Sequence, residues 1–192
     1  MLTRGLLQQN YEMWRKRARK IEAEDRVVND ADKSRERTMN RAVKLLAAKP
    51  RSIGELRGRL LEKLWTNEEI VDAVIEKLKE YKYLDDVQFA GDLAVSKLRQ
   101  KPQGKRRLQQ SLSTKQLDRE VMENAIVAAF EKLPEEELID EAISKRLRLK
   151  GKPESREDTK KFYDYLLRLG FGFDLIRSRL DEIVKLNDRE QL

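Results

Sequence analysis

The chain has 192 residues, of which 40% are charged and 39% hydrophobic, and its 42 basic and 35 acidic side chains give a net charge of +7. It contains no cysteine and no histidine, which excludes thiolate nucleophiles, the usual zinc sites and imidazole-based catalysis. No apolar run is long enough for a membrane span or a signal peptide, so a cytoplasmic protein is expected. The positive net charge predicts an anionic partner.

Residues 1–39 form a charged N-terminal extension that carries one apolar stripe. The stripe recurs at alternating four- and three-residue spacing, in Leu7, Tyr11, Trp14, Ala18 and Ile21. This spacing predicts one amphipathic helix from about Thr3 to Val28, followed by a frayed segment over 29–38. Three interpretations remain open for the extension: a poorly ordered tail, a helix packed on the body, or an arm that binds a partner.

From residue 40 the chain repeats itself with a period of about 50 residues. Pro50, Pro102 and Pro153 each end one helical pattern and precede the next. Apolar residues at helical spacing predict two further helices in each unit, and no run alternates as a strand would. The patterns predict an all-α fold of three tandem three-helix repeats forming an elongated curved array. The expected divisions are 40–84, 85–133 and 134–186, with a tail over 187–192.

Units of this size bury little surface alone, so the three are expected to pack into one body. Six positions of the helical patterns are predicted to be buried: Leu60, Leu78, Phe89, Leu93, Leu112 and Leu166.

Two acidic motifs are interpreted as helix starts. Asp85 is placed to cap a helix, with Asp86 in its first turn; a metal site is less favoured, because adjacent carboxylates point apart and no third ligand is near. Glu135, Glu136 and Glu137 follow Pro134 and place negative charge at the positive end of a helix. No catalytic, cofactor-binding or metal-binding residue is predicted.

Glycines and aromatic residues mark the junctions. Gly170-Phe171-Gly172 lacks the third glycine, the strand and the lysine of a phosphate-binding loop, and is interpreted as a turn between helices. Trp65 and Phe171 occupy matching positions in units one and three, where an aromatic plug between units is favoured over a base-stacking platform.

Basic residues recur at matching points of successive units, just before or after the matching prolines. The candidate surface residues, which have no acidic residue between the first and the last of each cluster, are Lys97, Arg99, Lys101, Lys105, Arg106 and Arg107, joined by Arg146 and Arg148. Their recurrence predicts a positive stripe along the array that forms a binding surface. The alternative is a solvated helix face, although such a face usually mixes both signs of charge.

The residues around the first of these clusters also follow a family pattern. They are Tyr83-Leu84-Asp85-Asp86, Phe89-Ala90, Ser96-Lys97-Leu98-Arg99, Pro102, Gly104 and Arg106-Arg107-Leu108. Together they resemble the centre of RecX, the bacterial regulator of the RecA recombinase. Residues 41–57 resemble the start of its first repeat, and residues 166–176 its third. Lys82, Leu64 and Gln116 depart from the pattern, since each stands where the family usually has glycine.

The resemblance implies a protein that binds RecA, lies in the groove of its filament on single-stranded DNA, and limits filament growth, ATP hydrolysis and strand exchange. A monomer without a cofactor is expected, and the basic residues would contact the filament or DNA. Two alternatives remain. One is a protein that binds single-stranded or duplex nucleic acid directly, without sequence preference; the other, least favoured, is a hydrolase or nuclease that relies on carboxylates.

Overall fold

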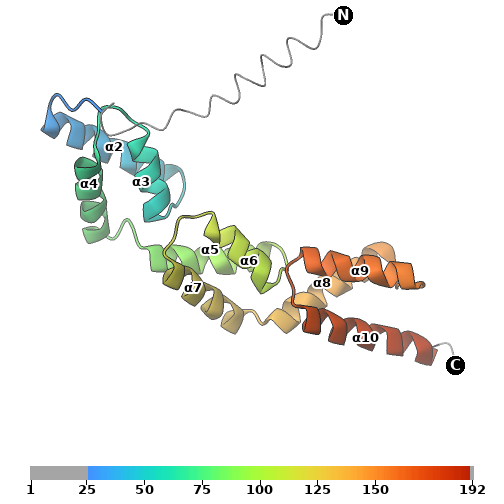
Figure 1. Cartoon of the computed structure of the whole chain (residues 1–192). Coiled ribbons are helices and arrows are strands. Elements are labelled where there is room, and N and C mark those ends of the chain that lie inside the picture. Colours follow the sequence, from blue (N-terminus) through green and yellow to red (C-terminus); the bar gives the residue numbers. More distant parts are fainter. Residues whose placement is uncertain (1–25, 191–192) are drawn as a thin grey trace, which may run out of the picture.

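The computed structural model describes residues 26–190, and from residue 184 onward it describes only the backbone. Over this range the chain is helical, without a strand, and its helices form an elongated, curved array (Figure 1). Unit one contains α2 (Ala31–Ala48), α3 (Ile53–Leu61) and α4 (Glu68–Glu80). Unit two contains α5 (Asp86–Gln100), α6 (Lys105–Ser113) and α7 (Arg119–Lys132). Unit three contains α8 (Glu135–Lys150), α9 (Arg156–Arg168) and α10 (Phe173–Glu190). The prediction of three three-helix repeats is confirmed.

Short polar side chains begin most of these helices, because each accepts a hydrogen bond from a first-turn N–H that has no partner within the helix. Asp85 caps α5 as predicted: its carboxylate accepts from Gln88 N at 2.9 Å. Equivalent side-chain caps precede five other helices: Asp30, Ser52, Asn67, Asp118 and Ser155. Within residues 26–190 none of the helices is long and apolar enough to cross a membrane.

The segment predicted to be frayed, residues 29–38, is instead the cap and first half of α2, so that prediction is wrong. Ser34 and Thr38 are buried, and the Thr38 hydroxyl donates to Ser34 O at 2.7 Å and lies 2.9 Å from Thr66 Oγ1. The inward face of this half-helix is made of small polar residues, so no apolar stripe marks it in the sequence. Residue 40 therefore lies inside α2, and the helix begins nine residues earlier.

Arg26 anchors the chain just before α2. Its guanidinium donates to Leu61 O at 2.8 Å, Lys63 O at 3.1 Å and Thr66 O at 3.2 Å, and so satisfies carbonyls at the end of α3 and in the connection to α4. Val27 N adds a bond to Leu64 O at 2.9 Å. Residues 26–28, the predicted end of the N-terminal helix, are not helical, and the rest of that predicted helix lies outside the described residues.

The buried apolar residues form two separate clusters. One lies in unit one and includes Leu56, Leu60, Val74 and Leu78. The other is shared by units two and three, which it joins across their boundary. Its members from α6 and α9 include Leu112 and Leu166. Four of the six positions predicted to be buried are therefore confirmed: Leu60, Leu78, Leu112 and Leu166.

Phe89 and Leu93 are only half-buried, so their predicted burial is wrong. Helix α5 turns Ala90, Ala94 and Leu98 inward instead, at four-residue spacing. Because successive helical residues are about 100° apart, a core face that runs through Ala90 and Ala94 leaves Phe89 and Leu93 at its margin. They face the space between units one and two.

Both junctions between units repeat one arrangement of polar contacts. At the first, Ile53 N donates to the Asp86 carboxylate at 2.8 Å, and the Ser52 hydroxyl donates to Lys115 O. At the second, Lys105 N donates to Glu135 at 3.0 Å, and Gly104 N donates to Leu169 O at 2.9 Å. In each case the start of a unit's second helix is held by the first residue of the next unit's first helix.

Two of the three positions that depart from glycine adopt the left-handed backbone that favours it. Lys82 has φ 58° and Gln116 has φ 52°, and each loses roughly 1 kcal/mol relative to glycine there. Leu64 does not have a positive φ. The equivalent of Gln116 in unit three is Gly170, with φ 89°, in the turn between α9 and α10, as predicted for Gly170-Phe171-Gly172.

Candidate binding surfaces

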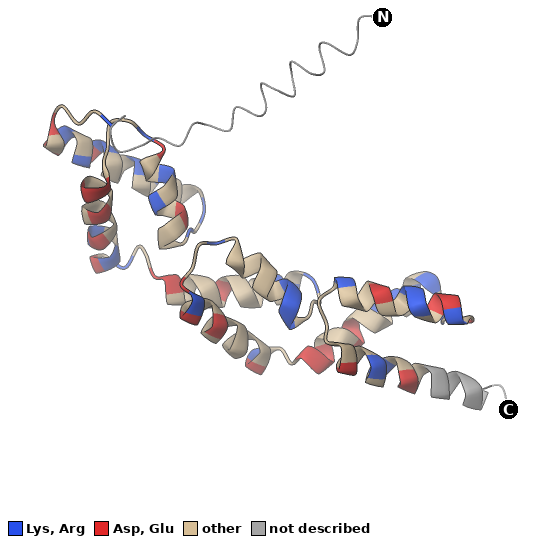
Figure 2. Ribbon diagram, viewed as in Figure 1, with Lys and Arg blue, Asp and Glu red and all other residues tan. Residues whose placement is uncertain are grey.

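The basic residues of the first cluster lie at the end of α5 and the start of α6. Lys97 and Arg99 are in the last turn of α5, while Lys105, Arg106 and Arg107 form the first turn of α6. Figure 2 shows this end of α6 in blue, close to α9 of unit three. All of them are exposed except Lys97, which is half-buried; Lys101, at the end of α5, is also exposed.

The second cluster lies on α8. Arg146 and Arg148 are near the end of α8, whereas Glu135 at the start of the same helix contacts Lys105. At 1.5 Å per residue, a helix separates residues 135 and 146 by about 17 Å along its axis. Across the chain, however, Arg107 and Arg146 both contact the end of α9, at Arg168 O and at the Tyr165 ring.

Helix α6 starts with an arrangement that opposes its own dipole. Cations near a helix N-terminus are typically unfavourable by 0.3–1 kcal/mol each, yet α6 has three and no acidic residue of its own in that turn. Only the Glu135 carboxylate, supplied by α8, accepts from its first N–H. Helix stability therefore does not explain why Lys105, Arg106 and Arg107 are there.

Three of the eight arginine and lysine side chains have contacts within the fold. Arg107 donates to Arg168 O at 2.9 Å, at the end of α9. The Arg146 guanidinium lies 4.7 Å from the centroid of Tyr165 and 5.5 Å from that of Phe162, so it helps to join α8 to α9. Arg106 lies 5.9 Å from the ring of Phe173, which is 57% exposed.

No ion pair joins any of the eight candidate residues to a carboxylate in the described part of the chain. Elsewhere on the surface such pairs are frequent, for example Arg57 with Glu68 and Asp72, and Arg119 with Glu123. A solvated helix face would show the same mixed pairing. In the described part of the chain these eight residues therefore differ from a solvated face with mixed charges; whether they form a binding surface stays a prediction.

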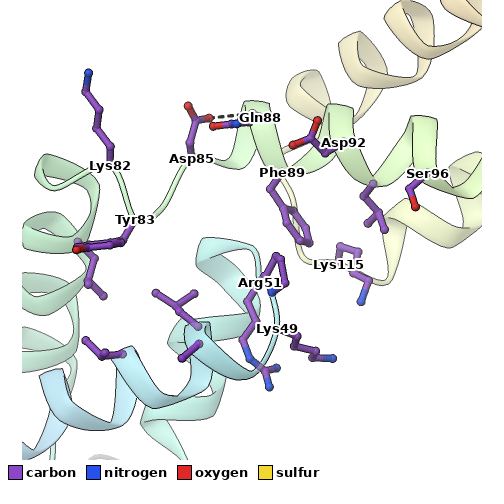
Figure 3. A pocket seen from close by; sticks show the side chains of 16 residues that line it. Lys49, Arg51, Lys82, Tyr83, Asp85, Gln88, Phe89, Asp92, Ser96 and Lys115 are labelled. Atoms are coloured by element: carbon purple, nitrogen blue, oxygen red, sulfur yellow. Dashed lines mark hydrogen bonds between the residues drawn. The ribbon is translucent and has the colours of Figure 1, made fainter.

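A second surface feature was not predicted from the sequence: a groove of about 810 Å³ between units one and two (Figure 3). Its apolar lining comes mainly from the end of α2 and the start of α5: Val43, Leu46, Ala47, Pro50, Leu78, Tyr83, Phe89 and Leu93. In Figure 3 the Phe89 ring points from α5 toward Arg51 across the groove. Apolar periodicity along a single helix does not show that two helices of different units leave such residues uncovered.

Charged residues border the groove: Lys49, Arg51, Lys82, Lys115, Asp85 and Asp92. Lys115 pairs with Glu55 at 3.0 Å, and the Asp85 carboxylate is used in capping. Asp86 lies at the junction of units one and two. Burial raises the pKa of its carboxyl, and the hydrogen bond from Ile53 N acts in the opposite direction.

Trp65 and Phe171, the residues predicted to be plugs between units, differ in what they contact. Phe171 is fully buried in the cluster shared by units two and three, consistent with a plug between them. Trp65 is half-buried within unit one, where the Arg37 guanidinium lies 4.6 Å from its ring centroid, so it does not join two units.

Comparison with known proteins gives consistent matches. The family model of the first three-helix domain of RecX matches residues 39–78, and that of the second domain matches residues 85–126. "Regulatory protein RecX" of Chlorobium limicola is 34% identical over 80% of this chain and 93% of its own length. The protein of the same name from Prosthecochloris aestuarii is 30% identical over 80% of this chain and 98% of its own.

The crystal structure of RecX from Lactobacillus salivarius has the same fold, with a TM-score of 0.70 and 22% identity, covering 79% of this chain and 97% of that one. The repeated three-helix units, the two matched domains and the relatives aligned over nearly their whole length agree. The chain therefore belongs to the RecX family of regulatory proteins.

Proposed function

We propose that this protein binds the RecA recombinase and its filament on single-stranded DNA and limits recombinase activity, and thereby regulates DNA repair and recombination. The observation that carries the proposal is membership of the RecX family together with an elongated array of repeats. An array of this shape can contact consecutive subunits of a helical polymer, and linked contacts multiply weak affinities.

The unpaired basic residues would supply the electrostatic part of this contact. Lys97, Arg99, Lys101, Lys105 and Arg106 are the residues proposed to meet the filament or its DNA from unit two, together with Arg107. Arg146 and Arg148 would do so from unit three. The protein would act as a monomer, in the cytoplasm and without catalysis, because its effect comes from occupying a surface of the recombinase.

The test is a titration of the protein against preformed and nascent RecA filaments at two DNA concentrations and moderate salt, with ATP turnover and filament length as readouts. We expect substoichiometric protein to slow ATP hydrolysis, because one bound regulator can block the addition of many subunits. Inhibition that disappears when DNA is in excess would contradict the proposal.

That outcome would favour the second candidate, a protein that binds nucleic acid directly without sequence preference. The ion-pair-free basic residues are the observation in its favour, because phosphate contacts need such cations. A direct DNA binder competes for the strand, so its effect requires coverage of the DNA.

A further inference from the structure

The groove between units one and two exposes residues that the fold does not use. Phe89 and Leu93 belong to neither apolar cluster, and Val43 and Tyr83, which also line the groove, are 50% and 69% exposed. Soluble proteins seldom leave several apolar side chains together in a concave surface unless something binds there. The stability of the array therefore does not account for this lining.

The shape and chemistry of the lining favour a protein segment over nucleic acid. The apolar part of the lining is mainly aliphatic, with Tyr83 and Phe89 as its two aromatic residues, whereas single-stranded nucleic acid is held by flat aromatic faces beside cations. An amphipathic helix can lay its apolar face into such a groove.

The charges at the border indicate the polar face of that helix. Lys49, Arg51 and Lys82 form no ion pair in the described part of the chain, and the Arg51 Nε hydrogen bond is to the neutral carbonyl of Leu45. Against these three cations stand two carboxylates, Asp85 and Asp92, so the border keeps a small excess of positive charge. Acidic side chains along the edge of the bound helix would complement this border.

We propose that the groove between units one and two binds an acidic amphipathic helical segment of the recombinase. The identity of the partner rests on the proposed function; the chemistry of the segment rests on the groove. This contact is distinct from the basic surface, because the groove lies at the first half of α5 and the candidate cations lie at its last turn and beyond. The two surfaces can therefore be altered independently.

The experiment compares two groove variants with a matched control. Phe89→Ala with Leu93→Ala removes apolar lining, Lys49→Glu with Lys82→Glu reverses the border, and Val127→Ala with Val27→Ala removes apolar side chains exposed elsewhere. Affinity is measured for RecA filaments on oligo(dT) and for bare oligo(dT), with thermal midpoints recorded for all variants.

We expect the apolar variant to bind the filament at least about tenfold more weakly, as central apolar anchors of an interface do. The charge variant should weaken filament binding more at low salt than at high salt. Both should bind oligo(dT) as the unaltered protein does, and the control should bind both targets normally.

Each other outcome has a defined meaning. Unaltered protein that fails to bind the filament refutes the proposed function, whereas normal filament binding by the apolar variant refutes the groove assignment alone. Loss of oligo(dT) binding by the apolar variant would make the groove a nucleic-acid site instead. If light scattering shows a dimer for the unaltered protein and a monomer for the apolar variant, the occupant of the groove is a second copy of the chain. Deletion of residues 1–25 could weaken filament binding as much as the apolar variant does, with no further loss when the two changes are combined. In that case the occupant is the chain's own N-terminal segment.

Discussion

Carboxylates at the first position of α5 and of α8 each join two units. Asp86 accepts a hydrogen bond from Ile53 N, and Glu135 accepts one from Lys105 N. Both also lie at the positive end of their own helix. An acidic residue at this position therefore begins one helix and holds the start of another.

Replacement of Asp86 tests this double role. Asp86→Ala leaves Ile53 N without its acceptor and should lower the free energy of unfolding by about 1 kcal/mol or more. Asp86→Asn keeps an acceptor oxygen and removes a charge whose burial is unfavourable, so it should be at least as stable as the unaltered protein at neutral pH. Chemical denaturation of both variants measures the difference.

The pH dependence has a definite sign. Burial raises the pKa of Asp86 above its ordinary value of 3.8, so its contribution to stability is complete below that pH and is lost as pH rises through the folded-state pKa. Asp86→Asn removes this dependence. The stability of the asparagine variant relative to the unaltered protein should therefore rise with pH across this window and be constant above it. A relative stability that falls with pH would show that the folded protein prefers the carboxylate.

Helix α6 is the element in which stability and binding conflict. Its first turn carries three cations at the positive end of the helix dipole, and none of the three pairs with a carboxylate side chain as an ion pair among the described residues. These cations lower the stability of α6.

Lys105→Glu with Arg106→Glu should therefore have opposite effects on the two properties. The thermal midpoint should stay the same or rise, because each substitution favours the dipole by roughly 0.3–1 kcal/mol. Binding to single-stranded DNA should weaken, and its salt dependence should fall by about 0.7 log units per lost phosphate contact for each tenfold rise in salt. Lys44→Glu on the exposed surface of α2 is the control. Equal binding by the α6 variant and the control would show that Lys105 and Arg106 belong to a solvated helix face and do not contact DNA.

Across the whole molecule, the apolar core is divided unevenly. Units two and three share one cluster, while unit one has its own and meets unit two through hydrogen bonds and the Lys115–Glu55 ion pair. Periodicity alone predicted one body. The divided core predicts that unit one opens independently of the other two, because its apolar contacts are local.

Leu60→Ala and Leu112→Ala distinguish these possibilities, since both side chains are fully buried, one in each cluster. Each should destabilise its own cluster by roughly 2–5 kcal/mol. In native-state hydrogen exchange, Leu60→Ala should accelerate exchange in α2, α3 and α4 only, and Leu112→Ala in units two and three together. Acceleration of all helices by either variant would show a single cooperative body.

The sequence by itself determined the helical class, the three repeats and the cap at Asp85. Periodic apolar residues, prolines between helices and acceptors such as Asp85 act locally, so they can be recognised without the fold. The resemblance carried by Tyr83 to Leu108 likewise indicated the family. The eight basic residues could be identified by type, although whether they bind the filament or DNA stays a prediction.

Only the tertiary structure decided where the units meet and what they leave open. The buried face of Ser34 and Thr38 is polar, so its burial cannot be predicted from apolar periodicity; it depends on Thr66, which lies against Thr38 in the fold. The dual use of Asp86 depends on Ile53, which is 33 residues away. The exposure of Phe89 and Leu93 depends on how unit one is held against α5. A helix pattern specifies which face is apolar; whether that face is covered depends on the packing of residues distant in the chain.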